Sequence, residues 1–141
     1  HYIGDRRGNK EEFMVGVDVP ITTLCPCSKE MSKVGAHNQR GLVRVLVKFK
    51  KFFWIEDIIK LVESSASAPV FALLKREDEK YLTELAYDQP RFVEDLVREV
   101  CRKLKKEGNF PWFKVEAENF ESIHNHNAYA MVVWEERKKK R

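Results

Sequence analysis

Long apolar runs, glycine, proline and cysteine are all scarce in this sequence. No run of about 18 apolar residues occurs in the chain, so we expect no helix that spans a membrane. Six glycines and five prolines, with 43% hydrophobic and 34% charged residues, are typical of an ordinary globular protein. Three cysteines, an odd number, do not form the disulfide framework of a small secreted domain. We therefore expect a cytoplasmic protein whose thiols are free or bound to a metal.

The length of 141 residues fits a single domain that buries a core without disulfides. Residues 1–12 are polar and are interpreted as a linker, and residues 137–141 form a basic tail. The net charge of +4 reflects local lysine clusters, which more often form a solvated end than contact nucleic acid, so we expect no nucleic-acid partner. The chain begins with His1 rather than methionine, which favours a fragment of a longer protein.

Residue periodicity predicts strands near both ends of the chain and helices between them. Alternating apolar and polar residues predict four strands, over residues 13–24, 42–49, 113–120 and 128–135. Apolar residues at helical spacing predict three helices, over residues 54–63, 76–86 and 90–107. The third helix is expected to have Asp88 as its cap and to end at Gly108. This order predicts an α+β fold, in which an antiparallel sheet is backed by helices on one face.

The stretch from Ile21 to Gly41 carries an unusual set of reactive side chains, including Cys25, Cys27 and His37. Prolines and a glycine interrupt its periodicity, so we expect it to be a loop. A second polar segment, Glu121–Asn127, also joins two predicted strands. Both segments are therefore expected at the same rim of the sheet, where the first would form the floor of an active site.

Metal ligands are available in both polar segments. Cys25, His37 and His124 supply a thiolate and two imidazoles, and catalytic zinc usually takes three protein ligands. A metal of this kind lowers the pKa of water, so that water becomes a nucleophile near neutral pH. The spacing of the Cys-x-Cys pair and the histidine is not that of a standard zinc finger. Free thiols in a turn therefore remain the alternative to a metal site.

The two other cysteines suggest different roles. Cys27 either closes a structural metal site as a fourth ligand or acts as a reactive thiol that shuttles protons, favoured by the positive charges of Lys29 and Arg40. The same two basic side chains are candidates for phosphate contacts. Cys101 lies on the apolar face of a predicted helix, so we expect a buried core thiol there.

The remaining candidates are two carboxylates and a histidine pair. Glu79 and Glu94 lie on predicted helices among many charged residues, a pattern that by itself favours a solvated helix face. His124 and His126 are two positions apart in a polar segment, and we expect one of the pair to face the site.

Three segments stand out in chain order: LCPCSKEMSKVGAHNQRG, QPRFVEDLV and NFESIHNHNAYA. Together they closely resemble the prokaryotic type IB GTP cyclohydrolase I family. The first segment is long and unusual, which makes the resemblance specific, and the likeness extends over nearly the whole chain. It implies that the chain is the C-terminal half of a longer, two-module protein, with the N-terminal half of the same protein as a partner.

This resemblance implies a fold, a reaction and an assembly. The fold is a tunnelling-fold module of ββααββ type, in which antiparallel sheets backed by helices pair into barrels. The reaction converts GTP and water into 7,8-dihydroneopterin triphosphate and formate, the entry step to folate and to 7-deazaguanosine modifications of tRNA. The assembly is a homotetramer with its sites at subunit interfaces.

The resemblance also implies roles for individual residues. The metal, zinc or manganese with iron(II) as a further possibility, would be held by Cys25, His37 and Glu79, with His124 in or beside the metal shell. Glu94 would anchor the guanine. Catalytic roles would fall to Cys25, Cys27, His124 and His126. Arg40 and Lys29 are our candidates for contacts to the triphosphate.

Two alternatives stay open. One is an archaeal-type iron(II) cyclohydrolase that gives a cyclic phosphate product. The other is a small zinc-stabilised module that binds RNA through a basic tail and has a closed metal site, formed by Cys25, Cys27, His37 and His124.

Overall fold

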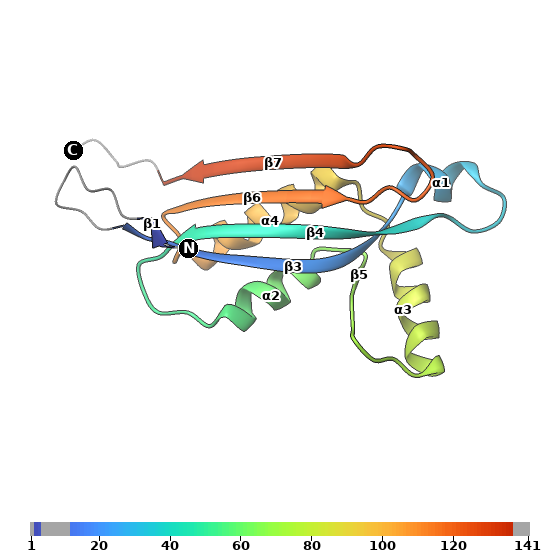
Figure 1. Cartoon of the computed structure of the whole chain (residues 1–141), viewed down its shortest axis with the longest axis horizontal. Helices are drawn as coiled ribbons and strands as arrows, with labels where there is room; N and C mark the ends of the chain where they lie inside the picture. Colours follow the sequence, from blue (N-terminus) through green and yellow to red (C-terminus); the bar gives the residue numbers. More distant parts are fainter. Residues whose placement is uncertain (1, 4–11, 137–141) are drawn as a thin grey trace.

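A five-stranded antiparallel sheet, of order β5-β3-β4-β6-β7, forms the centre of the molecule (Figure 1). The computed structural model describes residues 2–3 and 12–136. The sheet consists of β3 (Val15–Leu24), β4 (Asn38–Lys48), β5 (Ala68–Pro69), β6 (Trp112–Asn119) and β7 (Ala128–Glu135). A separate two-residue ladder pairs β1 (Tyr2–Ile3) with β2 (Glu12–Phe13).

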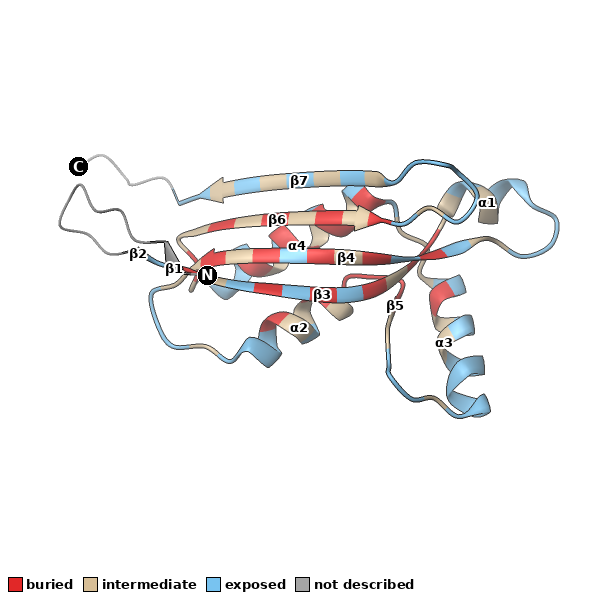
Figure 2. Ribbon diagram, in the orientation of Figure 1, coloured by how far each residue is buried: buried red, intermediate tan, exposed pale blue. Residues whose placement is uncertain are grey.

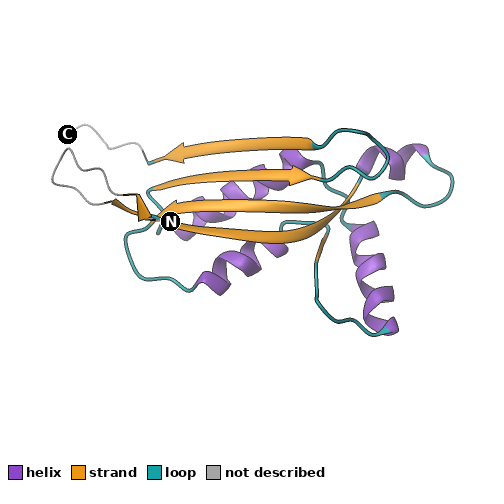
Figure 3. Ribbon diagram, viewed as in Figure 1, coloured by secondary structure: helices purple, strands orange, loops and turns teal. Residues whose placement is uncertain are grey.

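The helices are α1 (Pro26–Met31), α2 (Ile55–Glu63), α3 (Arg76–Asp88) and α4 (Val93–Glu107). Helix α4 packs against β6 and β7, and α2 packs against β3 on the same face of the sheet (Figure 3). Helix α3 stands beyond the edge of the sheet that β3 and β5 form. The prediction of an α+β fold with helices on one face is therefore confirmed.

Alternation along the strands separates a buried face from an exposed one, as the banded colours of Figure 2 show. Apolar side chains from three strands are almost fully buried against α2 and α4, among them Val19, Ile21, Val43, Val45, Val47, Phe113 and Val115. On β7, Tyr129, Met131 and Val133 instead remain 54%, 51% and 51% exposed. The second face of the sheet is thus open to solvent in this chain.

The expectation of one continuous loop between Ile21 and Gly41 is wrong. Strand β3 continues to Leu24, and β4 already begins at Asn38. Between them lies α1, whose first position is Pro26, because a proline fits the first helical turn without losing a hydrogen bond. The connection back to β4 contains Gly35 with φ 73°, a left-handed conformation that glycine adopts without strain.

The predicted start of the third helix is also wrong. Asp88 is the last residue of α3, and α4 begins at Val93 after an extended Phe92. A residue before proline disfavours helical geometry, so Gln89 leaves the helix with φ −122° and ψ 60°. The predicted end is confirmed, since Gly108 closes α4 with φ 66°.

The structure describes the two ends of the chain only in part. Of the expected linker 1–12, the structure describes residues 2, 3 and 12, which belong to the short β1–β2 ladder. The basic tail 137–141 lies outside the described residues. Residues 70–74 form neither helix nor strand. Within the described ranges, no helix is long and apolar enough to cross a membrane.

Candidate functional site

The two polar segments meet at one end of the sheet. The strand register places the end of β3 beside the start of β4, and the end of β6 beside the start of β7. The end with α1 and the β6–β7 loop lies on the right in Figure 1. The ring atom Nδ1 of His37 lies 3.0 Å from Oγ of Ser122, which joins the first segment to the second. The expectation of a shared rim is therefore confirmed.

Cys25 and His37 are held next to each other by hydrogen bonds of their backbones. The amide of Cys25 donates to the carbonyl of His37 over 3.1 Å. The hydroxyl of Ser28 donates to the carbonyl of Cys25 over 3.0 Å and accepts from the amide of His37 over 3.1 Å. Both side chains are half-buried. From the sequence alone, Ser28 had no assigned role. Its position three residues after Cys25, which caps α1, is the signal that could have indicated such a role.

The imidazole of His37 has a second partner, Gln39, whose Oε1 lies 3.1 Å from Nδ1. The amide nitrogen of Gln39 donates to Oγ1 of Thr23 over 3.0 Å. Gln39 is 7% exposed and Thr23 is fully buried, so this polar pair lies inside the protein. Sequence reasoning missed Gln39, Thr23 and Ser122, because their roles depend on strand register and on a contact between distant segments.

Glu79 and Arg40 line the same cavity, of about 300 Å³, between β4 and α3. Asn38, the residue after His37, lines it too. Glu79 lies in the first turn of α3 and is exposed. Within the described part of the chain, however, no three His, Cys, Asp or Glu side chains are close enough to hold a metal. The structure thus pairs Cys25 with His37 and brings Glu79 to a neighbouring cavity, without closing a ligand set.

The remaining predicted residues lie around this end of the molecule or on its helices. Cys27 is exposed on α1, and Glu94 is exposed in the first turn of α4. His124 and His126 are exposed in the β6–β7 loop, where their rings stack with centroids 5.3 Å apart and planes at 16°. Strand β7 begins only at Ala128, so both histidines lie in the loop that precedes it.

Lys29 connects α1 to the end of α3. Its ammonium group donates to the backbone carbonyl of Tyr87 and lies 4.2 Å from the centre of the Tyr87 ring. Cys101 is 5% exposed, as expected of a core thiol, and burial raises its pKa to about 11. These two residues therefore contribute to packing in this chain.

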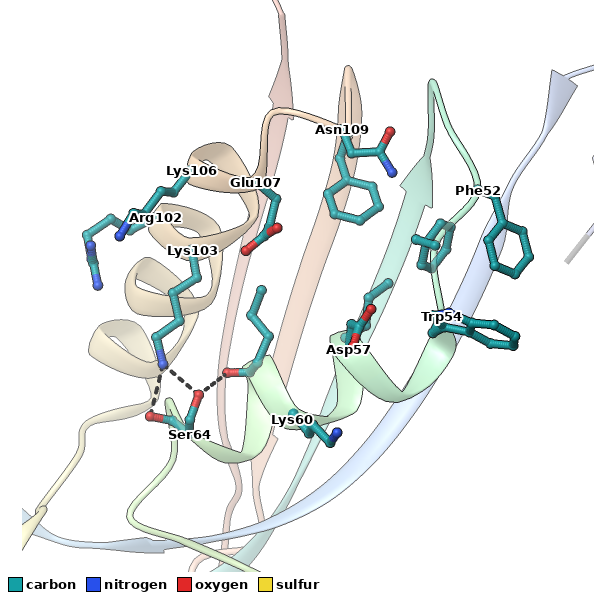
Figure 4. Close-up of a pocket in the computed structure, with 14 residues that line it drawn as sticks. Phe52, Trp54, Asp57, Lys60, Ser64, Arg102, Lys103, Lys106, Glu107 and Asn109 are labelled. Atoms are coloured by element: carbon teal, nitrogen blue, oxygen red, sulfur yellow. Dashed lines mark hydrogen bonds between the residues drawn. The ribbon is translucent and has the colours of Figure 1, made fainter.

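A second cavity, larger than the first, lies elsewhere, between α2 and α4, with a volume of about 860 Å³ (Figure 4). Aromatic and basic side chains line it, including Phe52, Trp54, Lys60, Arg102 and Lys106. Lys103, which also lines it, donates to the carbonyl and hydroxyl of Ser64 over 3.0 and 2.8 Å. The residues that line this cavity include none of the predicted site residues.

Two comparisons, one with family models and one with curated proteins, agree on one family. A family model described as type I GTP cyclohydrolase FolE2 matches residues 2–130. GTP cyclohydrolase FolE2 of Syntrophus aciditrophicus is 63% identical over 131 residues, which cover 93% of this chain and 51% of that protein. GTP cyclohydrolase FolE2 of Dictyoglomus thermophilum is 57% identical over 123 residues, which cover 87% and 48%. The chain thus spans about half the length of these curated relatives.

A solved structure shows the same fold. The apo form of an archaeosine synthase QueF-Like superposes on this chain with a TM-score of 0.52. The superposition covers 86% of this chain and 95% of the archaeosine synthase chain. At 17% sequence identity this likeness supports the tunnelling fold and carries no information on chemistry. The family match, which extends over most of the chain and includes both polar segments, is more specific. The chain therefore belongs to the type I GTP cyclohydrolase FolE2 family.

Proposed function

We propose that the intact protein is a metal-dependent, type IB GTP cyclohydrolase I, which converts GTP and water into 7,8-dihydroneopterin triphosphate and formate. The observation that carries this proposal is the junction at the end of the sheet. There Cys25 and His37 share a backbone hydrogen bond, and His37 contacts the loop that holds His124 and His126. The relatives' name, GTP cyclohydrolase FolE2, supports GTP as the substrate. We propose folate synthesis as the pathway.

The donor atoms at this end fit a metal in their chemistry. The hydrogen bonds of His37 with Gln39 and Ser122 both use Nδ1, so Nε2 is the ring atom that would bind the metal. Thiolate, imidazole and carboxylate together suit zinc, and they also accommodate manganese or iron(II). We assign this role to Cys25, His37 and Glu79, with His124 beside them. When bound, the metal supplies Lewis acidity that activates water for hydrolysis of the purine ring.

The substrate is held by residues outside this ligand group. The carboxylate of Glu94 accepts hydrogen bonds from N1–H and the exocyclic amine of guanine, a pair of donors that adenine lacks. Arg40, at the rim of the 300 Å³ cavity, binds the triphosphate. Lys29 would join it by leaving Tyr87. Cys27, His124 and His126 move protons to and from the opening ring.

We propose that further chains or segments complete the site. The described residues do not form a closed group of metal ligands, and the chain spans half of its relatives. The open face of the sheet also carries the half-exposed side chains of Tyr129, Met131 and Val133. We infer a cytoplasmic homotetramer with its sites at subunit interfaces, where the N-terminal half of the same protein contributes.

GTP turnover by the intact protein tests the proposal. The protein is stripped of metal and reloaded with zinc, manganese or iron(II), and the pterin product is oxidised and measured by fluorescence. Turnover should return with metal, and Cys25→Ala should abolish metal-dependent turnover. Glu94→Gln should lower kcat/KM for GTP by about a hundredfold or more, because it presents a donor to the guanine.

Asp95→Asn is the matched control for Glu94→Gln, since Asp95 lies in the same helical turn but pairs with Arg98 at 2.6 Å. It should leave turnover unchanged. Chromatography of the product separates a triphosphate from a cyclic phosphate and so tests the iron(II) alternative. Tight metal binding without pterin formation from any metal would overturn the proposed reaction and favour the zinc-stabilised module.

A further inference from the structure

A buried polar pair determines which nitrogen of His37 carries the proton. Oε1 of Gln39 is a carbonyl oxygen, so it accepts hydrogen bonds and cannot donate one. It lies 3.1 Å from Nδ1 of His37, and that contact is a hydrogen bond when Nδ1 holds the proton. In the neutral imidazole, the proton on Nδ1 leaves a lone pair on Nε2. The pair therefore selects the tautomer that presents Nε2 as a ligand atom.

The orientation of the Gln39 amide is itself fixed from the interior. Its Nε2 donates to the hydroxyl of Thr23 over 3.0 Å, which turns Oε1 towards the imidazole. Thr23 lies opposite Gln39 in the register of β3 and β4, and the two side chains are 0% and 7% exposed. Because both side chains are buried, water cannot replace Thr23 as the hydrogen-bond partner of Gln39. The orientation of the Gln39 amide is therefore held by the protein alone.

Ser122 adds a second contact from the other polar segment. Its hydroxyl lies 3.0 Å from the same Nδ1, and it accepts from the same N–H when Nδ1 holds the proton. Ser122 is exposed, whereas Gln39 is buried, so Gln39 is the more rigid of the two partners. Partners that orient a histidine and set its tautomer are a regular feature of metal sites in proteins.

We propose that Gln39, held by Thr23, is a positioning residue that keeps Nδ1 of His37 protonated and directs Nε2 towards the metal. This inference deepens the proposed function and rests on it, since it requires His37 to be a ligand. Ser122 supports the same geometry and couples it to the β6–β7 loop.

Cobalt(II) binding to the metal-stripped, intact protein tests the role of Gln39 without depending on turnover. The visible and near-ultraviolet bands of cobalt bound to a thiolate give both the coordination and the dissociation constant. Gln39→Leu should weaken cobalt binding by about ten- to a hundredfold, the usual effect of losing such a partner. Gln39→Glu should restore affinity to within about threefold of wild type, because a carboxylate accepts from Nδ1 and the Thr23 hydroxyl can donate to it.

Two further variants separate positioning from loss of stability. Ser122→Ala, in an exposed loop, should weaken binding less than Gln39→Leu and remain folded. Ser65→Ala removes a buried hydroxyl that donates to Leu61 at 2.7 Å, on a different element, and should leave the cobalt constant unchanged. If Gln39→Leu does not fold, Thr23→Val tests the same relay, with an expected loss of about three- to tenfold.

The outcomes distinguish this inference from the proposed function. The positioning role would be overturned if Gln39→Leu bound cobalt with wild-type affinity, or if Gln39→Leu and Gln39→Glu weakened cobalt binding equally. In either case, GTP turnover by the wild-type protein would leave the proposed function intact. Absence of a thiolate–cobalt band in the wild-type protein would overturn both.

Discussion

The ammonium group of Lys29 lies 4.2 Å from the centre of the Tyr87 ring and donates a hydrogen bond to the Tyr87 carbonyl. This contact joins α1, which follows Cys25, to the last turn of α3, whose first turn holds Glu79. A lysine at a helix C-terminus is also favourable for the helix dipole. Lys29 thus fixes the relative position of two helices that border the candidate site.

Loss of either partner should loosen this connection. We expect Lys29→Met to lower the free energy of unfolding by about 1 kcal/mol, because it removes both the cation–π contact and the bond to the carbonyl. Tyr87→Leu should cost less, since the carbonyl remains. A double-mutant cycle measured by urea denaturation should give a coupling of about 0.5–1 kcal/mol. Additive effects would contradict the contact.

Gly41 should not tolerate a side chain. A Cβ atom at this position would lie 2.8 Å from Asn119 Oδ1, 2.8 Å from Ile21 Cδ1 and 3.0 Å from the Glu118 carbonyl. We expect Gly41→Ala to lower stability by about 1–3 kcal/mol in thermal or urea unfolding, because the backbone contact cannot give way easily. Ile21→Val, which removes Cδ1, should cost less in the Gly41→Ala background than in wild type.

Gly108→Ala provides a comparison of another kind. Its φ is +66° and nothing lies within 4 Å of a Cβ there, so the cost comes from the backbone alone. We expect about 1 kcal/mol, with no relief from Ile21→Val. Equal costs and equal responses at the two glycines would contradict the steric account of Gly41.

The three thiols should differ in reactivity towards a water-soluble disulfide reagent. Cys27 is exposed, whereas Cys101 is buried with a pKa raised to about 11 by desolvation. At pH 8 a thiol with that pKa is about one part in a thousand thiolate, so Cys101 should react only when the protein opens. The fastest phase should disappear in Cys27→Ser, and denaturant should accelerate the slowest. A fast phase that survives Cys27→Ser and is lost in Cys101→Ser would contradict this assignment.

Glu116 should make stability depend on acid pH. Hydrogen bonds from Lys114 and Tyr129, each 2.7 Å long, hold the pKa of Glu116 below its usual 4.5. A lowered pKa in the folded state stabilises the protein above the pKa of the unfolded chain, and this stabilisation is lost as the pH falls through the folded value. Glu116→Gln should therefore cost about 1 kcal/mol at neutral pH, and this difference should shrink below about pH 4.5. Urea unfolding across that range measures it, and a difference that does not change with pH would contradict the linkage.

Local patterns predicted much of the fold because they are set by neighbouring residues. The alternation in β4 places Val43, Val45 and Val47 on one face, and all three are buried in the core. The predictions are wrong where a proline changes the local geometry. The sequence predicts an irregular loop around Pro26, but a helix begins at this residue. The sequence also predicts a helix from Pro90, but that helix begins only at Val93.

By itself, the sequence determined the α+β class, the four long strands and the two polar segments, because periodicity and turn residues act over short distances. Only the tertiary structure decided that Ser122 reaches His37 across 85 positions and that Thr23 lies opposite Gln39 in the interior. Such contacts depend on strand register and on the shared end of the sheet, which no local pattern specifies. The network around His37 is therefore a property of the folded sheet rather than of any one segment.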